Sequence, residues 1–167
     1  MKNQFFRINP ICEYGRSPIR VEAIEEYELF ENFHKNSSII KNNKLRAVKG
    51  MKWNDVIKFE SSSHFIISKK LKETLEQNQI TGIEFFPVEI KLRPRKKYFG
   101  FYLTHIAGPI LNSEDASFGI APIEFDENKW NGSDIFTLEE TLLTLISKKT
   151  KEVIEEGKFT NLEIRPI

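Results

Sequence analysis

Two aspartates, Asp55 and Asp134, are the residues of this chain whose type and placement come nearest to a catalytic pair. Each follows a Trp-Asn pair and precedes two apolar residues, so the chain presents the same carboxylate twice. Paired carboxylates can act as general acid and general base in hydrolysis. The duplication itself favours a structural role, because an Asp after Trp-Asn often accepts hydrogen bonds from nearby backbone N–H groups in a turn. We therefore predict two turn residues, and a hydrolase built on them is a third-ranked alternative.

No other group of residues has the spacing that catalysis or metal binding requires. The three histidines, His34, His64 and His105, are far apart, and none lies at ligand spacing from a second His or an acidic cluster. Cys12 is the only cysteine, and the run Ser61 to Ser63 is typical of a solvated turn. The sequence contains neither a phosphate-binding glycine loop nor a nucleophile elbow. We expect no enzyme activity, no metal site and no cofactor.

Two short stretches carry charge of one sign, although the net charge of the whole chain is only +1. The first, residues 21 to 31, has five acids and no base, and we predict that it contacts a basic partner. The second, residues 91 to 97, has five bases and no acid. The candidate partner-binding acids are Glu22, Glu25, Glu26, Glu28 and Glu31, and the alternative basic patch is Lys91, Arg93, Arg95, Lys96 and Lys97.

The basic stretch precedes an aromatic one, and together residues 91 to 102 offer an alternative function. RNA-binding strands stack bases on aromatic rings beside Lys and Arg, so this stretch could form an RNA-binding module. Aromatic residues that alternate along a strand are, however, usually half core, and a charged turn before a strand is usually solvated. We therefore do not expect nucleic acid as the partner.

An internal similarity shows which elements must position these residues. Residues 67 to 88 align without a gap with residues 146 to 167, and ten of the 22 positions are identical. The similarity extends upstream to Asp55 and Asp134, which makes two segments, 55–88 and 134–167. A repeat of this length suggests two copies of one supersecondary unit. We predict that the two copies superpose.

Each segment reads as a strand, a helix and a second strand. Ser68 and Ser147 follow apolar runs and can cap helices that begin at the next residue and end near Gln77 to Gln79 and at Gly157, where Gly can adopt the left-handed conformation. A competing capping box at Thr137 would make residues 138 to 156 one helix. We prefer a strand for residues 143 to 146, because the first segment has Ser61-Ser62-Ser63 in the corresponding region and cannot easily be helical there.

The remaining elements complete an α+β fold, in which a mixed, largely antiparallel sheet carries the two repeat-related units. Six further stretches complete this prediction: strands at residues 19 to 23, 98 to 103 and 121 to 125, a loop at 108 to 119, a helix at 25 to 33, and a polar connection at 35 to 43. We expect an N-terminal strand and helix segment at residues 1–52 and a core at 53–167, packed as one compact domain.

Composition limits the location of the protein. Apolar residues make up 40% and charged residues 29% of the chain, as in ordinary folded proteins. The N-terminus lacks the apolar run of a signal peptide, and no stretch of about 20 apolar residues occurs. We expect a cytoplasmic protein that does not bind membranes.

The repeated pattern also carries a family resemblance. Both segments resemble the closing module of bacterial immunity proteins of polymorphic toxin systems, groups 11 and 43. The resemblance is carried by Asp-Val-Ile and Asp-Ile-Phe, by the Ile-Ser-Lys-Lys entry to each helix, and by the run Thr81 to Val88. The resemblance covers about residues 53 to 167 and includes the aromatic strand and loop between the segments. It implies an antitoxin-like bacterial protein that binds and neutralises a cognate toxin by protein–protein contact and brings no catalytic residues. We take this as the expected function.

Overall fold

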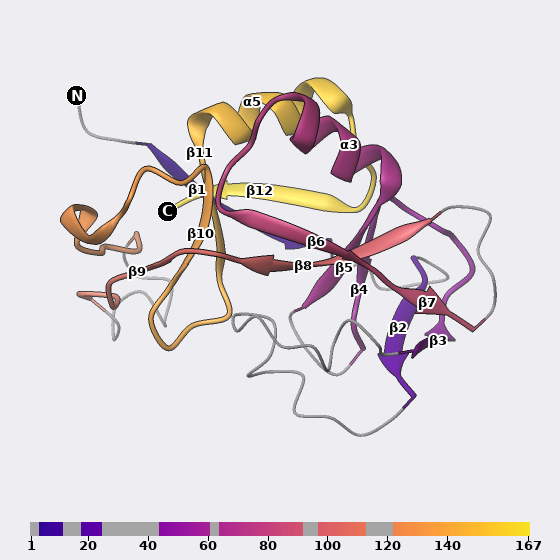
Figure 1. The fold of residues 1–167 in the computed structure, drawn as a ribbon. Coiled ribbons are helices and arrows are strands. Elements are labelled where there is room, and N and C mark those ends of the chain that lie inside the picture. Colours follow the sequence, from indigo (N-terminus) through magenta and orange to yellow (C-terminus); the bar gives the residue numbers. More distant parts are fainter. Residues whose placement is uncertain (1–3, 12–17, 25–43, 61–63, 92–96, 113–121) are drawn as a thin grey trace.

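The computed structural model describes residues 4–11, 18–24, 44–60, 64–91, 97–112 and 122–167 (Figure 1). Short strands dominate these ranges, and two helices and one 3₁₀ turn accompany them. In chain order the elements are β1 (Phe5–Pro10), β2 (Arg20–Ala23), β3 (Lys44–Lys49), β4 (Val56–Lys58), β5 (Phe65–Ser68), α3 (Lys69–Gln77), β6 (Ile83–Pro87), β7 (Glu89–Ile90), β8 (Tyr98–Leu103), β9 (Ile106–Ala107), η1 (Glu127–Lys129), β10 (Ile135–Leu138), β11 (Thr144–Ser147), α5 (Lys148–Gly157) and β12 (Leu162–Pro166).

The strands form three sheets in which most neighbours run antiparallel. A five-stranded sheet has the order β12-β1-β11-β10-β9, a four-stranded sheet the order β4-β5-β8-β6, and a three-stranded sheet the order β2-β3-β7. Among the strand pairs that the structure describes, β10–β9 and β3–β7 are parallel and the others antiparallel. The α+β class and the largely antiparallel pairing are confirmed, whereas the single sheet that we expected is wrong. Three sheets form because β2 pairs with β3, and neither pairs with a strand of the two larger sheets.

Both helices begin where a strand ends, and a serine marks each boundary. Ser68 Oγ accepts from the N–H of Leu71, and Ser147 Oγ accepts from the N–H of Thr150, as expected for N-caps. Apolar or small residues at helical spacing bury one face of each helix: Leu71 and Leu75 in α3, and Thr150 and Ile154 in α5. The helices pack against each other on one side of the molecule, as Figure 1 shows.

Segments 55–88 and 134–167 thus form the same elements in the same order. The preference for a strand at residues 143 to 146 is confirmed by β11, and the competing helix from Leu138 is wrong because Leu138 lies in β10. At the end of α5 the left-handed residue is Lys158, with φ 48°, whereas Gly157 is the last helical residue, so the cap predicted at Gly157 is displaced by one position. The superposition of the two segments stays a prediction.

Each segment receives one strand from elsewhere in the chain, and this feature was not predicted. β8 lies between β5 and β6, and β1 lies between β11 and β12, antiparallel to both neighbours in each case. The registers correspond: Tyr98 is opposite Ser68, and Phe5 is opposite Ser147. The N-terminal strand therefore occupies in one sheet the position that β8 occupies in the other.

One predicted strand is absent. Of residues 122–125 only Phe125 forms a bridge, to Ile110, so the strand expected at 121 to 125 is wrong over its described part. The strands expected at 19 to 23 and 98 to 103 correspond to β2 and β8. The helix expected at residues 25 to 33 and the connection at 35 to 43 lie outside the described residues.

The largest apolar cluster joins both segments. It combines strand residues of the two larger sheets with the inner faces of α3 and α5, including Ile67, Ile146, Leu71 and Ile154. A second cluster, around Phe5, Phe125, Phe136 and Leu145, lies under the five-stranded sheet. The two segments are consequently held together by burial of apolar surface as well as by the polar contacts described next.

Candidate functional site

Asp55 is a buried carboxylate that links the two segments. It is 5% exposed and accepts hydrogen bonds from Ser68 Oγ at 2.9 Å, Thr160 Oγ1 at 3.0 Å and the Thr160 N–H at 3.1 Å. Beside it the Val56 N–H donates to the Thr160 carbonyl at 3.3 Å. We call this contact between the start of β4 and the start of β12 the Asp55 seam.

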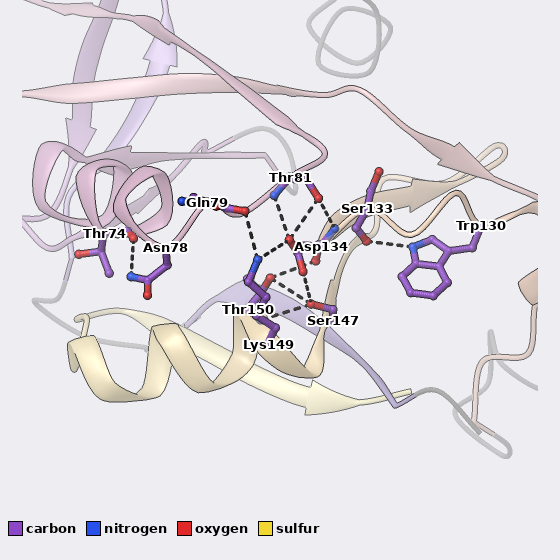
Figure 2. Close-up of polar contacts among 10 residues, drawn as sticks. All are labelled: Thr74, Asn78, Gln79, Thr81, Trp130, Ser133, Asp134, Ser147, Lys149 and Thr150. Carbon is purple, nitrogen blue, oxygen red and sulfur yellow. Dashed lines mark hydrogen bonds and ion pairs between the residues drawn. The ribbon is translucent and has the colours of Figure 1, made fainter. Parts of the chain in front are cut away.

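Asp134 makes the reciprocal contact with the first segment (Figure 2). Its carboxylate accepts from Ser147 Oγ at 3.0 Å and from the N–H and Oγ1 of Thr81 at 3.1 Å each. The Ile135 N–H donates to the Thr81 carbonyl at 3.0 Å. This Asp134 seam joins β10 to the start of β6. The prediction that both aspartates bind nearby N–H groups of a turn is wrong, since the Thr partners are 105 and 53 residues away.

The two seams differ in solvent access and in charge. The side chain of Asp134 is 13% exposed and forms an ion pair with Lys149 at 3.1 Å. Burial alone would raise the pKa of Asp134, but the hydrogen bonds from Thr81, Lys149 and Ser147, with the charge of Lys149, outweigh burial and lower the pKa. A carboxylate held ionised in this way is a poor general acid. Asp55 is too buried to meet a substrate, so the geometry of both residues is that of structural links between segments.

Glu22 is the one predicted partner-binding acid that lies within the described residues. It pairs with Arg46 across β2 and β3, with 2.9 Å between Oε2 and Nη2. Its charge is therefore partly compensated on the surface. Glu25, Glu26, Glu28 and Glu31 lie outside the described residues.

The described basic residues and the aromatic residues of the stretch 91–102 differ in their exposure to solvent. Lys91 and Lys97 are exposed, whereas Arg93, Arg95 and Lys96 lie outside the described residues. Tyr98, Phe101 and Tyr102 are at most 5% exposed and belong to the core. Tyr98 also donates its hydroxyl to the Asn54 carbonyl at 2.7 Å. Rings that are buried in this way cannot stack on bases, so these three aromatic residues could not serve an RNA-binding surface.

The two histidines within the described residues have different environments. His64 is buried in the core, and His105 Nε2 accepts from the Asn131 N–H at 3.2 Å. His34 and Cys12 lie outside the described residues. Within the part of the chain that the structure describes, no cluster of three His, Cys, Asp or Glu side chains could hold a metal ion.

A groove of about 630 Å³ opens where three distant parts of the chain meet. The bridge between Ile110 and Phe125 and the bond from the Leu111 N–H to the Glu124 carbonyl, at 2.8 Å, hold one wall. The lining comes from the N-terminal strand, the 111–127 region and the C-terminal end: Gln4, Phe5, Phe6, Leu111, Pro122, Ile123, Glu124, Phe125, Glu127, Pro166 and Ile167. Sequence reasoning missed this groove because only tertiary folding brings its parts together.

A family comparison identifies the class of protein. A family model described as "Immunity protein family (Imm11)" matches residues 11–110. The chain belongs to the Imm11 immunity protein family. The match confirms the resemblance to an immunity protein. It begins upstream of the stretch that carried the resemblance and ends at residue 110, so residues 111–167 lie outside it.

Two further comparisons concern relatives and membranes. No curated protein matches the chain. Among the described ranges, neither helix is long and apolar enough to cross a membrane.

Proposed function

We propose that this Imm11 protein binds a cognate bacterial toxin in the cytoplasm and neutralises it by protein–protein contact. The observation that carries the proposal is the family match over residues 11–110. The structure supports it in one respect: the carboxylates that resembled catalytic groups are engaged in holding the two segments together. A binding role needs a stable surface and no reacting group.

The acidic stretch is the first surface that we propose for the toxin. Five acids in residues 21 to 31 would favour a basic partner, since complementary charge speeds encounter and excludes wrong partners. The Arg46 partner of Glu22 reduces the contribution of that residue. The effect should therefore come mainly from Glu25, Glu26, Glu28 and Glu31.

Co-expression with the toxin encoded beside this gene tests the proposal. The wild-type protein should rescue growth, and the quadruple change of Glu25, Glu26, Glu28 and Glu31 to Lys should reduce rescue and slow association. A matched control reverses four helix-surface acids, Glu73, Glu76, Glu152 and Glu155, whose ion pairs are exposed and contribute little to stability. Growth that does not depend on this gene would refute toxin neutralisation, whereas full rescue by the quadruple variant would exclude only the acidic surface.

A further inference from the structure

The groove beside Phe125 has an apolar floor that is fixed before any ligand arrives. Phe5 packs against Phe125, Trp130 and Phe136 with ring centroids 5.2, 4.9 and 5.4 Å away. Edge-to-face and tilted ring pairs of this kind are favourable packing arrangements of aromatic side chains. A floor of packed rings offers an apolar surface for an apolar side chain of a partner.

The rim of the groove is both apolar and acidic. Leu111 is 64% exposed, although it is a large hydrophobic residue next to a pocket. Glu124 is exposed, and no ion pair to it is found within the described ranges. Glu127 adds a second carboxylate to the lining, and none of the lining residues that the structure describes is Lys or Arg. Such a rim is complementary to a base that stands beside an apolar anchor.

The groove also lies outside the part of the chain that the family model describes. All of its described lining residues fall before residue 11 or after residue 110. A scaffold shared by a family cannot by itself distinguish one toxin from another, because specificity requires contacts that differ between partners. The parts beyond the shared range are suited to that task.

We propose that this groove is a toxin-recognition surface, which receives a segment of the cognate toxin with an apolar or aromatic anchor next to Lys or Arg. The anchor fills the space over Phe5 and Phe125, and the base pairs with Glu124. The volume of about 630 Å³ is sufficient for a side chain and its neighbours, since pockets for small ligands are roughly 300–1,000 Å³. This inference rests on the proposed function and adds a second contact surface for the toxin.

Two groove variants, each with a matched control, test the inference. Leu111→Asp places a charge in the apolar rim, and its control is Met51→Asp, an 83% exposed hydrophobic residue after β3. Glu124→Lys reverses the rim charge, and its control is Glu156→Lys, an exposed acid on α5. Binding of each purified variant to the purified toxin domain is measured by calorimetry at two salt concentrations. Thermal unfolding of each variant verifies the fold, and Leu111→Ala serves as a milder second variant.

The outcomes separate the groove from the proposed function. We expect both groove variants to weaken binding at least about tenfold, as loss of an interface anchor does, while both controls stay within about twofold. The Glu124→Lys effect should shrink at high salt. If the wild-type protein and both groove variants bind the toxin equally well, the groove is not the recognition surface, but the proposal of toxin neutralisation stands. No binding by the wild-type protein would overturn both, and self-association that is lost in the groove variants would assign the groove to a second copy of this chain.

Discussion

Replacement of Asp55 by Ala should destabilise the protein more than the same change at Asp134. At Asp55, the N–H and hydroxyl of Thr160 and the hydroxyl of Ser68 lose a charged acceptor in a site that is 5% exposed. A hydrogen bond to a charged group contributes about 1.5–3 kcal/mol, and a buried donor that is left without an acceptor costs about 1–3 kcal/mol. The three losses do not add fully, because Ser68 can rotate and water can enter the space left by the carboxylate. We expect a loss of about 3–4 kcal/mol in the free energy of unfolding.

At Asp134 the same chemistry should contribute less. The side chain is 13% exposed, and its ion-pair partner Lys149 is half exposed, so water can replace part of what is lost. A loss of about 2 kcal/mol is expected there, because exposure lets solvent satisfy the freed donors. In a chain of this size the two changes would lower the midpoint of thermal unfolding by roughly 10 °C and 5 °C.

Urea unfolding followed by circular dichroism measures both losses under the same conditions. Glu76→Ala is the control, because its pair with Lys72 is an exposed contact within one helix and should contribute less than about 0.5 kcal/mol. The slope of the free energy against urea must stay unchanged for the comparison to hold. A loss below about 1 kcal/mol for Asp55→Ala, or a larger loss for Asp134→Ala, would refute the assignment of the seams as the polar links between segments.

Two further predictions concern the same seams. The pKa of folded Asp134 lies below its ordinary value of 3.8, so ionised Asp134 stabilises the fold above that pH, and this contribution is lost as the pH falls through the lowered pKa. The stability difference between wild-type and Asp134→Asn should therefore be constant near neutral pH and shrink below about pH 4. A difference that grows towards acid pH would contradict this direction of the pKa shift. Gly82 has φ +87°, and a Cβ there would collide with the Ile135 carbonyl oxygen, so Gly82→Ala should lower the free energy of unfolding by more than about 2 kcal/mol. Asn161→Gly, at φ +66° in the matching position, should lower it by about 1 kcal/mol or less, because relief of the backbone offsets the lost bond from Asn161 Nδ2 to the Val56 carbonyl. Equal losses in urea unfolding would show that the two turns do not differ in this way.

The elements that the sequence predicted correctly are those that local signals specify. Ser68 and Ser147 mark helix starts because their side chains bond to N–H groups three residues later. The buried residues Leu71 and Leu75 lie four positions apart, which matches one turn of helix and places both on the same face. Such information lies within a few residues, so a single sequence was sufficient.

The role of the two aspartates was misassigned because their partners are distant. The alignment of the segments contains the decisive signal, since Thr81 and Thr160 are identical just as Asp55 and Asp134 are. A local turn was assumed to join each Asp to its neighbours, whereas each Asp binds the Thr of the other segment. Identical polar residues in two copies can thus mark contacts between the copies. Periodicity within one copy cannot detect these contacts.

The position of β1 could not be predicted for a related reason. Six residues, Phe5 to Pro10, carry no alternation strong enough to choose a face, and their partners lie at the opposite end of the chain. The correspondence with β8 becomes visible only through the register, in which Phe6 and Phe99 are opposite Ile146 and Ile67. The same matching extends to the helices, where Lys151 lies over the ring of Phe6 and Lys72 over that of Phe99.

The same correspondence separates the scaffold of this protein from the surfaces proposed to bind a toxin. The helices, their flanking strands, β1 and β8 are engaged in matched contacts, and a change in one of them disturbs a seam or the shared core. The groove wall at residues 110–112 and 122–125 and the three-stranded sheet around Glu22 have no counterpart among these matched elements. Substitutions of exposed residues there, such as Leu111 and Glu124, can alter a binding surface at little cost in stability, because surface changes away from core and caps shift the free energy of unfolding by only about 0.5 kcal/mol. A protein that must match one particular toxin can therefore change these unmatched parts while the seams preserve the fold.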